Sequence, residues 1–355
     1  MDTEERLELI TRNTQEVITT HELKKSIESR ARLTGYIGVE PSGLLPISWI
    51  IWIEKLKDLI NAGVDMTVLL ATWHALINDK LGGNIGNIGK CAEYIKQCLE
   101  ALEVDLRKAS FVYAEDLIGE PGYWTTLLRL SKHVSLARAK RALTILGRKK
   151  GDLGIDFAKL IYPSMQVTDI FMLDVDLCLG GEDQRRAHVL AREIAPKLGR
   201  KKPIAVHTPL LVGLQGTNRM DTQKMRREEI LVDAKMSKSR PASSIFIHDE
   251  PEEIREKIMK AYCPPGEVEM NPVLEIARYL IFPRVDKLVV TRAKGKKRSS
   301  VFRDYSDLAC EYARGLHPLD VKMAVAESLS AILRPVRLYF KRKPKLLKEI
   351  RTIST

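Results

Sequence analysis

The chain has 355 residues, of which 45% are hydrophobic and 29% charged, an ordinary composition for a globular protein with a sizeable core. No apolar run is long enough to cross a bilayer, and the acidic start, Met1-Asp2-Thr3-Glu4-Glu5, lacks the features of a secretory signal, so a cytoplasmic protein is expected. The net charge of +12 favours a polyanionic partner, because phosphates release counterions to Lys and Arg, although many basic proteins bind no nucleic acid.

The first part of the chain predicts alternating strands and helices. Two amphipathic helices are expected at 3–18 and 21–31, then a strand at Thr34–Val39 that ends in the turn Glu40-Pro41-Ser42-Gly43. A helix at Ile47–Ala62 and a buried strand at Met66–Ala71 follow. The further expected elements are helix 86–103, strand 110–114, helices within 122–147, helix 156–172, strand 175–179, helix 183–198 and strand 203–206. This order implies a parallel sheet with helices on both faces.

Helices predominate after about residue 250, with expected spans near 251–261, 271–281, 304–313 and 319–340. We therefore expect a Rossmann-like, doubly wound parallel-sheet domain at 1–250 and a mostly α-helical domain at 251–355. Basic residues gather in the second part: the run from Arg292 to Arg303 has six and no acid, and the run from Arg334 to Arg351 has eight against one Glu. This surplus predicts an RNA-contacting module, with a solvated basic tail as the alternative.

Two common phosphate loops and the metal motifs are absent. No Gly-x-Gly-x-x-Gly follows the first strand, and the nearest match to a P-loop, ending at Gly89-Lys90, begins with Asn84 and is followed by Cys91. The stretch 82–89 is interpreted as a loop that enters a helix. The five cysteines form no Cys-x-x-Cys, and Cys91 and Cys98, seven apart on one helix face, are predicted to be core residues. No structural metal is expected.

The sequence Lys235-Met236-Ser237-Lys238-Ser239 carries the strongest chemical signal. Two lysines three residues apart, interleaved with hydroxyls, provide cations and hydrogen-bond donors for a polyphosphate. Reactions that expel diphosphate need such groups, because negative charge builds up on the leaving group. An ordinary basic surface loop is the alternative. The string also resembles the signature loop of the class I aminoacyl-tRNA synthetases.

Five blocks in register resemble the tyrosyl-tRNA synthetases of archaeal and eukaryotic type over nearly the whole chain. These blocks are Gly35–Gly43, Tyr162–Asp169, Gly180–Arg185, Lys235–Ser239 and His317–Asp320. The resemblance implies an enzyme that activates L-tyrosine with ATP and Mg²⁺ and transfers the tyrosyl group to tRNA(Tyr). It also implies a homodimer, for which the apolar helices near 122–147 are candidates, and no tightly bound cofactor.

The resemblance also assigns a tyrosine site. It implies that Tyr36 and Asp169 hold the substrate hydroxyl, and that Tyr162, Gln166 and Gln184 hold its α-amino group and the surroundings of its ring. The helical spacing of 162, 166 and 169 places all three on one face, where a polar solvent-facing surface is the alternative. Buried polar partners select a phenol because a phenyl ring would leave them unsatisfied. For His74 a pocket position and a core position remain equally open.

Further roles follow from the same resemblance. ATP would contact Gly38, Glu40 and Lys238, and Gly38 would let the nucleotide approach the strand end closely. Lys235, Ser237, Lys238 and Ser239 would form the catalytic loop. Arg185 would contact the first base pair of the acceptor stem, and His317 and Asp320, at a helix start, would read the first anticodon base.

One segment departs from the family pattern. The family's His-Ile-Gly-His element corresponds here to Pro46-Ile47-Ser48-Trp49, which lacks the first His and the Gly. Backbone amides at the helix start, helped by Lys235 and Lys238, could bind phosphate instead. Alternatively, the chain is a catalytically impaired paralogue that binds tRNA or tyrosine without activation. A tryptophanyl synthetase is disfavoured by the pair Tyr36 and Asp169. No anticodon-stacking residue is assigned in the divergent segment 284–303.

Overall fold

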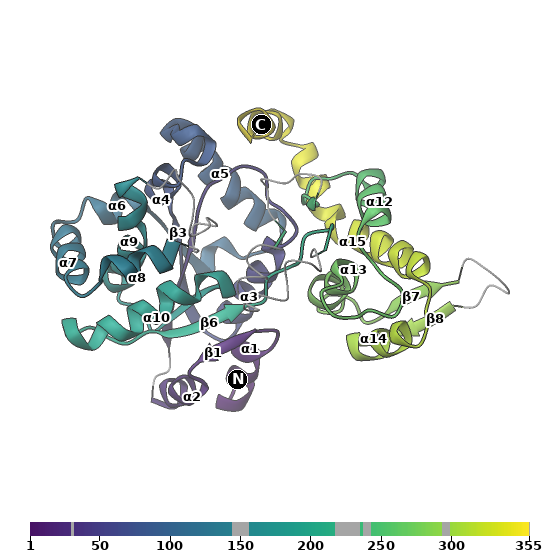
Figure 1. Cartoon of the computed structure of the whole chain (residues 1–355), viewed down its shortest axis with the longest axis horizontal. Coiled ribbons are helices and arrows are strands. Elements are labelled where there is room, and N and C mark those ends of the chain that lie inside the picture. The colour runs from purple at the N-terminus through teal and green to yellow at the C-terminus, as the bar shows by residue number, and fades with distance from the viewer. Residues whose placement is uncertain (30–31, 144–155, 217–234, 237–242, 293–298, 355) are drawn as a thin grey trace. The chain divides into compact units, whose positions relative to one another are not determined.

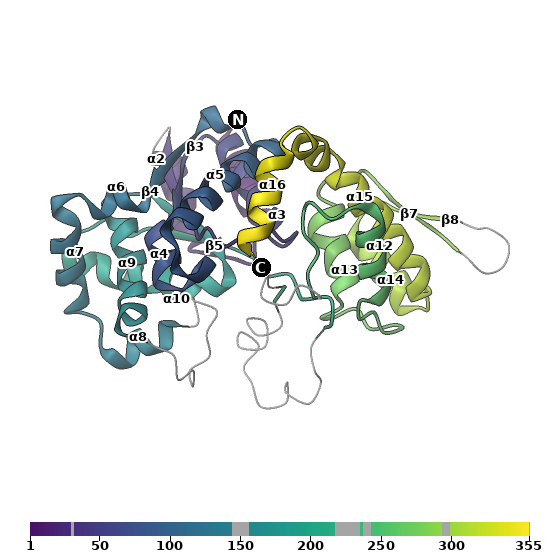
Figure 2. The same ribbon diagram turned by 90° about the horizontal axis from the view of Figure 1, so that it is seen from above.

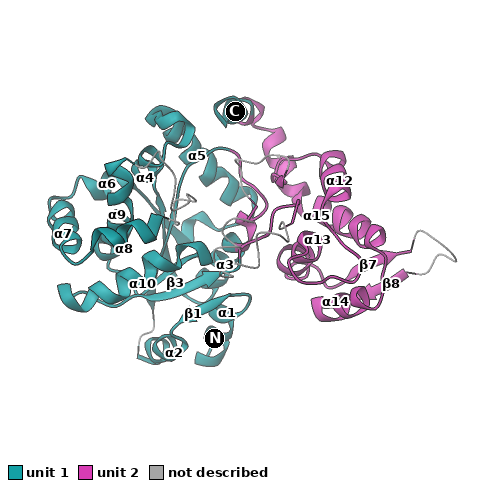
Figure 3. Cartoon of the chain, in the orientation of Figure 1, with its two compact units in different colours: residues 1–43, 52–209, 348–355 teal, residues 44–51, 210–347 magenta. Residues whose placement is uncertain are grey.

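The computed structural model describes residues 1–29, 32–143, 156–216, 235–236, 243–292 and 299–354. The chain divides into two compact units, drawn in different colours in Figure 3. Unit 1 comprises residues 1–43, 52–209 and 348–355, and unit 2 comprises 44–51 and 210–347.

Unit 1 is built on one twisted sheet with the strand order β1-β6-β5-β2-β3-β4. The strands are β1 (Glu16–Ile18), β2 (Leu33–Val39), β3 (Val64–Leu70), β4 (Ala109–Tyr113), β5 (Leu177–Gly181) and β6 (Ile204–Thr208). β2 to β6 run parallel, and only the edge strand β1 is antiparallel to its neighbour. The sheet is doubly wound, as the sequence predicted, because the chain moves outward from β2 first to one side and then to the other.

The helices of unit 1 cover both faces of this sheet, with α9 and α10 on one side and α3 and α5 on the other (Figures 1 and 2). These helices are α1 (Thr3–Thr11), α2 (Thr20–Ser29), α3 (Trp49–Asn61, with its first turn in unit 2), α4 (Thr72–Ile77), α5 (Ile85–Ala101), α6 (Ala114–Ile118), α7 (Pro121–Ser131), α8 (Leu136–Ala142), α9 (Phe157–Leu173) and α10 (Arg185–Ile194). Cys91 and Cys98 are both fully buried on α5, which confirms that they are core residues.

One local prediction for unit 1 was wrong. The helix expected at 3–18 ends at Thr11, because Asn13 adopts a left-handed conformation with φ 53°, which Asn tolerates better than most residues. The following residues form β1, and Gln15 N–H donates to His207 O at 2.7 Å. The stretch 82–89 enters a helix as expected: Asn84 is the N-cap of α5, which begins at Ile85, one residue before the predicted start.

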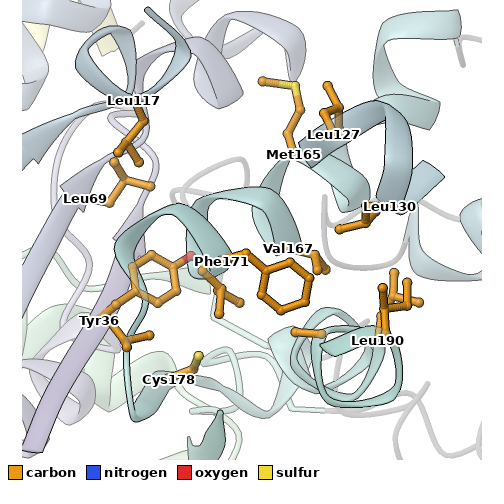
Figure 4. Packing of buried hydrophobic residues seen from close by; sticks show 14 of the residues in the cluster. Tyr36, Leu69, Leu117, Leu127, Leu130, Met165, Val167, Phe171, Cys178 and Leu190 are labelled. Carbon is orange, nitrogen blue, oxygen red and sulfur yellow. The ribbon is translucent and has the colours of Figure 1, made fainter. Parts of the chain in front are cut away.

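A buried apolar cluster supports the strand ends from the α9 side. Tyr36 of β2 and Cys178 of β5 contribute to it, together with Val167 and Phe171 of α9 and Leu190 of α10 (Figure 4). Since all of these side chains are at most 3% exposed, the elements that carry the polar site residues are fixed by close packing.

Unit 2 is mostly helical, as expected. It contains α12 (Pro251–Lys260), α13 (Pro272–Ile276), which continues into a π-helical turn at Ala277–Ile281, α14 (Tyr305–Ala313), α15 (Pro318–Lys341) and the start of α16 (Pro344–Ser354). An antiparallel pair, β7 (Leu288–Thr291) and β8 (Ser299–Phe302), was not predicted. No helix in the described part of the chain is long and apolar enough to span a membrane.

The second half of α16 belongs to unit 1. Ile350 is fully buried, Glu349 forms an ion pair with Lys90 of α5, and Ser354 lies against Gly43. A Cβ atom at Gly43 would lie 2.6 Å from Ser354 Oγ, and Gly43 has φ +100°, so this position requires glycine. The C-terminal helix thus ends beside the loop that follows β2.

Candidate active site

The ends of two strands define the place where a ligand would bind. β2 pairs with β3 on one side and with β5 on the other, so the direction of winding reverses between β2 and β5. Open α/β sheets bind ligands at the carboxyl ends of the strands at this point. The loop after β2 carries Glu40, and the short helical turn Glu182–Gln184 follows β5.

Helix α9 brings three polar side chains into the interior. Its first turn is capped by Asp156, whose Oδ1 accepts from Lys159 N–H at 2.9 Å. Tyr162, Gln166 and Asp169 are 7%, 8% and 1% exposed. Such burial excludes a polar solvent-facing surface for this face of the helix. The predicted spacing therefore places the three residues together on the buried side.

Asp169 is a deeply buried carboxylate of the candidate site. Its Oδ1 accepts a hydrogen bond from Tyr123 Oη at 2.9 Å, and its Oδ2 lies 3.0 Å from His74 Nε2. The imidazole is not aligned for a hydrogen bond, and Oδ2 has no hydrogen-bond partner among the described residues. Burial by itself would lower the pKa of His74, but the Asp169 carboxylate raises it above its ordinary value.

Tyr36 lies on β2 in the same buried region. Burial, followed by the negative charge of Asp169, raises the pKa of its hydroxyl well above the usual range, so Tyr36 stays protonated and can donate a hydrogen bond. Its hydroxyl passes over Gly38, where a Cβ atom would lie only 2.8 Å away. The absence of a side chain at Gly38 therefore makes room for Tyr36. The predicted contact of Gly38 with a nucleotide remains a proposal.

Glu40 connects the loop after β2 to α9. Its Oε1 accepts from Tyr162 Oη at 2.5 Å, and both of its oxygens lie 3.2 Å from Asn78 Nδ2. Lys80 Nζ is 3.8 Å from Oε2. Burial, followed by the Glu40 carboxylate, raises the pKa of the Tyr162 hydroxyl well above the usual range. These contacts give the loop beside the strand end a fixed shape.

Gln166 and Gln184 join α9 to the turn after β5, because Gln166 Nε2 donates to Gln184 Oε1 at 3.2 Å. Gln166 Oε1 has no hydrogen-bond partner among the described residues. Together with Asp169 Oδ2 it is a buried acceptor without a donor, and each such group costs about 1–3 kcal/mol when left unpaired. These two buried acceptors on α9 indicate a ligand that donates at both places.

The lysine-containing loop is described only at its base. Lys235 pairs with Val212 in an isolated antiparallel bridge, and Met236, which is buried, donates its N–H to Leu211 O at 2.7 Å. Ser237, Lys238 and Ser239 lie outside the described residues. The described residues of this loop belong to unit 2, whereas the tyrosine-site candidates belong to unit 1.

The divergent segment Pro46–Trp49 is held by its backbone. Ile47 N–H donates to Ile245 O at 2.9 Å, and Ile247 N–H donates to Leu45 O at 3.0 Å. Helix α3 begins directly afterwards, at Trp49. The segment thus opens a helix, as the sequence predicted, and its position depends on main-chain bonds that many side chains would permit.

The three candidate tRNA-contacting residues lie at helix starts. Arg185 is the first residue of α10, and its Nε donates to Glu16 at 2.5 Å. His317 is the N-cap of α15, where its Nδ1 accepts from Leu319 N–H at 3.2 Å, and Asp320 is in the first turn of the same helix. Arg185 belongs to unit 1, and His317 and Asp320 belong to unit 2.

One candidate site residue was left open by the sequence analysis, and a second was missed. His74, whose position was left open, contacts Asp169 and meets the Tyr162 ring edge-on at 5.0 Å between ring centres. Tyr123, the hydrogen-bond donor to Asp169, was not considered at all. The only available signal was a tyrosine inside an apolar helix, and fully buried tyrosines usually find a hydrogen-bond partner.

Comparisons with known proteins agree with this geometry. The family model for class I tRNA synthetases (W and Y) matches residues 28–224 and 229–334. A tyrosine–tRNA ligase from Saccharolobus islandicus is 50% identical over 100% of this chain and 99% of its own length. The crystal structure of tyrosyl-tRNA synthetase from Aeropyrum pernix is 45% identical with a TM-score of 0.87, covering 99% of both chains. The L-tyrosine complex of the Pyrococcus horikoshii enzyme is 42% identical with a TM-score of 0.91, covering 99% of this chain and 100% of that one.

A sheet that winds outward in both directions, with a polar site where the winding reverses, and the matching family model define a class I tRNA synthetase. Within this class, full-length identity of 50% to a tyrosine–tRNA ligase is decisive. The chain belongs to the archaeal-type tyrosyl-tRNA synthetases, as the five sequence blocks indicated. None of these similarities favours an impaired paralogue.

Proposed function

We propose that this chain acts as a tyrosine–tRNA ligase. It activates L-tyrosine with Mg·ATP to give tyrosyl-adenylate and diphosphate, and it then transfers the tyrosyl group to the 3′-terminal hydroxyl of tRNA(Tyr). The relatives support this proposal through their names and, for the Pyrococcus horikoshii structure, through the L-tyrosine in the complex. A cytoplasmic location is part of this proposal, because tRNA(Tyr) is its substrate.

The observation that carries the proposal is the buried Oδ2 of Asp169, which lies 3.0 Å from His74 Nε2. Asp169 Oδ2 is buried and has no hydrogen-bond partner among the described residues, while Tyr123 occupies the other oxygen. A phenol hydroxyl can donate to Oδ2 and accept from Tyr36, whose own hydroxyl stays protonated. Phenylalanine would leave both groups unsatisfied, which is costly in a buried site. The α-ammonium group of tyrosine would donate to Gln166 Oε1, near Tyr162 and Gln184.

Catalysis in this proposal needs no nucleophilic side chain. The carboxylate of tyrosine attacks the α-phosphate of ATP, and the bond to the diphosphate leaving group breaks. The protein contributes position and charge, which together account for most of the acceleration in phosphoryl and nucleotidyl transfer. Lys235 and Lys238, with Ser237 and Ser239, would stabilise the leaving diphosphate. Gly38, near the end of β2, and Glu40, in the loop that follows, would flank the nucleotide.

tRNA would contact both units. Arg185 would meet the first base pair of the acceptor stem, and His317 and Asp320 would read the first anticodon base. Helix starts suit this task, because side chains there can reach unstacked bases.

A homodimer is supported by exposed apolar side chains on α7 and α8. Trp124, Leu128 and Leu136 are 53%, 66% and 59% exposed, which is unusual for side chains of this size on neighbouring helices. Sedimentation of the variant Leu128→Glu tests this contact. A shift of the dimer toward monomer is expected, and a wild-type protein that sediments as a monomer would contradict the dimer.

Tyrosine-dependent exchange between ATP and diphosphate tests the activation step. We expect exchange with tyrosine, and very weak exchange with phenylalanine or tryptophan. A folded protein that shows no exchange with any of the three amino acids would refute the function, and preference for tryptophan would reassign the substrate.

A further inference from the structure

A series of polar contacts connects Arg185 through Glu16 to two buried histidines, His207 and His188. Arg185 Nε donates to Glu16 Oε1 at 2.5 Å, His207 Nδ1 lies 3.0 Å from the same oxygen, and His207 Nε2 lies 3.0 Å from His188 Nδ1. The two imidazoles stack at 5.1 Å between ring centres, with 11° between their planes. His188 and His207 are at most 1% exposed.

The sheet register creates this cluster. β1 pairs antiparallel with β6 so that Glu16 stands opposite His207. His188 lies one turn after Arg185 on α10, which places both side chains on the same face of the helix. Four residues from three elements therefore meet, and the short edge strand β1 supplies Glu16, whose Oε1 both Arg185 and His207 contact.

The hydrogen bonds can run in one consistent direction. Burial lowers the pKa of both histidines, so both rings are neutral. A neutral ring has one donor nitrogen and one acceptor nitrogen. If His207 donates from Nδ1 to Glu16, its Nε2 must accept from His188 Nδ1. This arrangement satisfies both bonds, and Glu16 then accepts from His207 and from Arg185.

Arg185 is placed where helix electrostatics disfavour it. It is the first residue of α10, next to Arg186, and the first turn contains no acid. A cation at a helix N-terminus is opposed by the helix dipole. Its side chain is 39% exposed, and Glu16 occupies only Nε. The terminal N–H groups of the guanidinium have no hydrogen-bond partner among the described residues, so they can face a phosphate or a base edge.

The inner end of the cluster reaches the tyrosine site. A Cβ atom at Gly180 would lie 2.9 Å from His188 Cε1 and 3.0 Å from Gln184 Cβ. His188 and Gln184 thus pack against the same backbone position at the end of β5, and Gln184 accepts from Gln166. The orientation of Arg185 is therefore fixed relative to the strand end that carries the site.

We propose that Glu16 is a positioning residue that holds the Arg185 guanidinium, with support from His207 and His188, in the orientation that binds the acceptor end of tRNA. This inference rests on the proposed function and adds a residue that contacts no substrate. Without Glu16, the long Arg185 side chain would have to be ordered when tRNA binds. Ordering such a side chain weakens binding by about three- to tenfold.

The test compares Glu16→Ala, Glu16→Gln and a matched control, Glu4→Ala, which removes a carboxylate from an exposed ion pair with Lys24 in the same unit. Each variant is assayed for aminoacylation of a tRNA(Tyr) transcript, for filter binding of that transcript and for tyrosine-dependent exchange. Glu16→Ala should raise the tRNA KM and Kd by about three- to tenfold, with unchanged exchange. Glu16→Gln, which retains an acceptor, should lie closer to wild type, and Glu4→Ala should match wild type.

A double-mutant cycle with Arg185→Ala measures whether Glu16 affects tRNA binding through Arg185. If Glu16 acts through Arg185, Glu16→Ala has no further effect on tRNA binding in the Arg185→Ala background. Equal effects in both backgrounds would overturn the proposal. Tighter tRNA binding by Glu16→Ala would also overturn it, because Glu16 would then only repel phosphate. A parallel loss of exchange would mean a general structural role. Absence of exchange in the wild type would instead refute the proposed function, while the filter-binding cycle would still test Glu16.

Discussion

The proposed tyrosine pocket and the segment that opens α3 are held in place by different kinds of contact. In the pocket, side chains make the decisive contacts: Asp169 meets Tyr123 and His74, and Gln166 meets Gln184. At Leu45 and Ile47, main-chain bonds to Ile247 and Ile245 hold the segment Pro46–Trp49. Recognition of a phenol needs particular side chains, whereas a phosphate can be bound by backbone N–H groups and a helix dipole. The difference explains how one region keeps the family's residues while the other departs from them.

The variant with the largest expected effect removes a side-chain contact of the proposed pocket. Asp169→Asn removes the charge and turns one acceptor into a donor. Because hydrogen bonds to charged groups contribute about 1.5–3 kcal/mol, the tyrosine KM in the exchange assay should rise roughly 10- to 150-fold, with the ATP KM unchanged. Tyr123→Phe, which removes only the donor to Oδ1, serves as the control with a smaller effect. An unchanged tyrosine KM in Asp169→Asn would refute the role of Asp169.

A second variant tests the packing around Tyr36 in the proposed pocket. Gly38→Ala places a methyl group 2.8 Å from the Tyr36 hydroxyl, so Tyr36 must move. Overpacking of this kind costs about 1–3 kcal/mol, and the tyrosine KM should rise by at least about fivefold. Gly89→Ala, where a Cβ atom meets nothing within 4 Å, is the matched control. A rise confined to the ATP KM would show that Gly38 serves the nucleotide.

The free energy of unfolding should depend on pH through a buried carboxyl at the base of the lysine-containing loop. Glu275 Oε2 accepts from Val212 N–H at 2.9 Å, and Val212 pairs with Lys235. Burial raises the pKa of Glu275 from 4.5 to about 7. A carboxyl that keeps its proton in the folded state contributes stability that is fully present below pH 4.5 and is lost as the pH rises to about 7.

The size of this effect is on the order of 3 kcal/mol, since one pKa unit corresponds to about 1.36 kcal/mol. Urea unfolding at several pH values measures it. In Glu275→Gln, which keeps the acceptor but does not titrate, the decline in the free energy of unfolding across this window should be smaller by that amount. An identical pH profile in the variant would contradict the shifted pKa.

The smallest expected effect concerns the divergent segment. The double variant Pro46→His with Ser48→Gly restores the family's side chains, yet the helix dipole contributes only about 0.3–1 kcal/mol and the backbone already provides it. Exchange activity should therefore change by less than about fivefold. A much larger gain would mean that backbone binding does not replace the missing histidine.

The sequence predicted the elements that are long and periodic. β2 and α9 were placed within one or two residues, because a buried parallel strand and a 17-residue helix have strong apolar patterns. β1 was missed, since three residues carry no pattern of their own and depend on pairing with β6. The pair of β7 and β8 was missed because each strand has only four residues and depends on pairing with the other.

The sequence predicted those candidate site residues that belong to one short motif. Tyr162, Gln166 and Asp169 share one helix face, so their spacing was informative. His74 and Tyr123 reach Asp169 from α4 and α7, and no spacing along the chain relates three separate elements. Such partners become visible only when the fold brings them together, and their role depends on the burial of Asp169.

The end of α16 is a suitable position for a fluorescent label. Ser354 touches Gly43, three residues beyond Glu40, so a small environment-sensitive dye attached there through Ser354→Cys would sit beside the loop next to the proposed nucleotide site. Its fluorescence would report nucleotide binding without radiolabelled substrate. Of the five native cysteines only Cys310 is exposed, so one Cys310→Ser change would make such labelling specific.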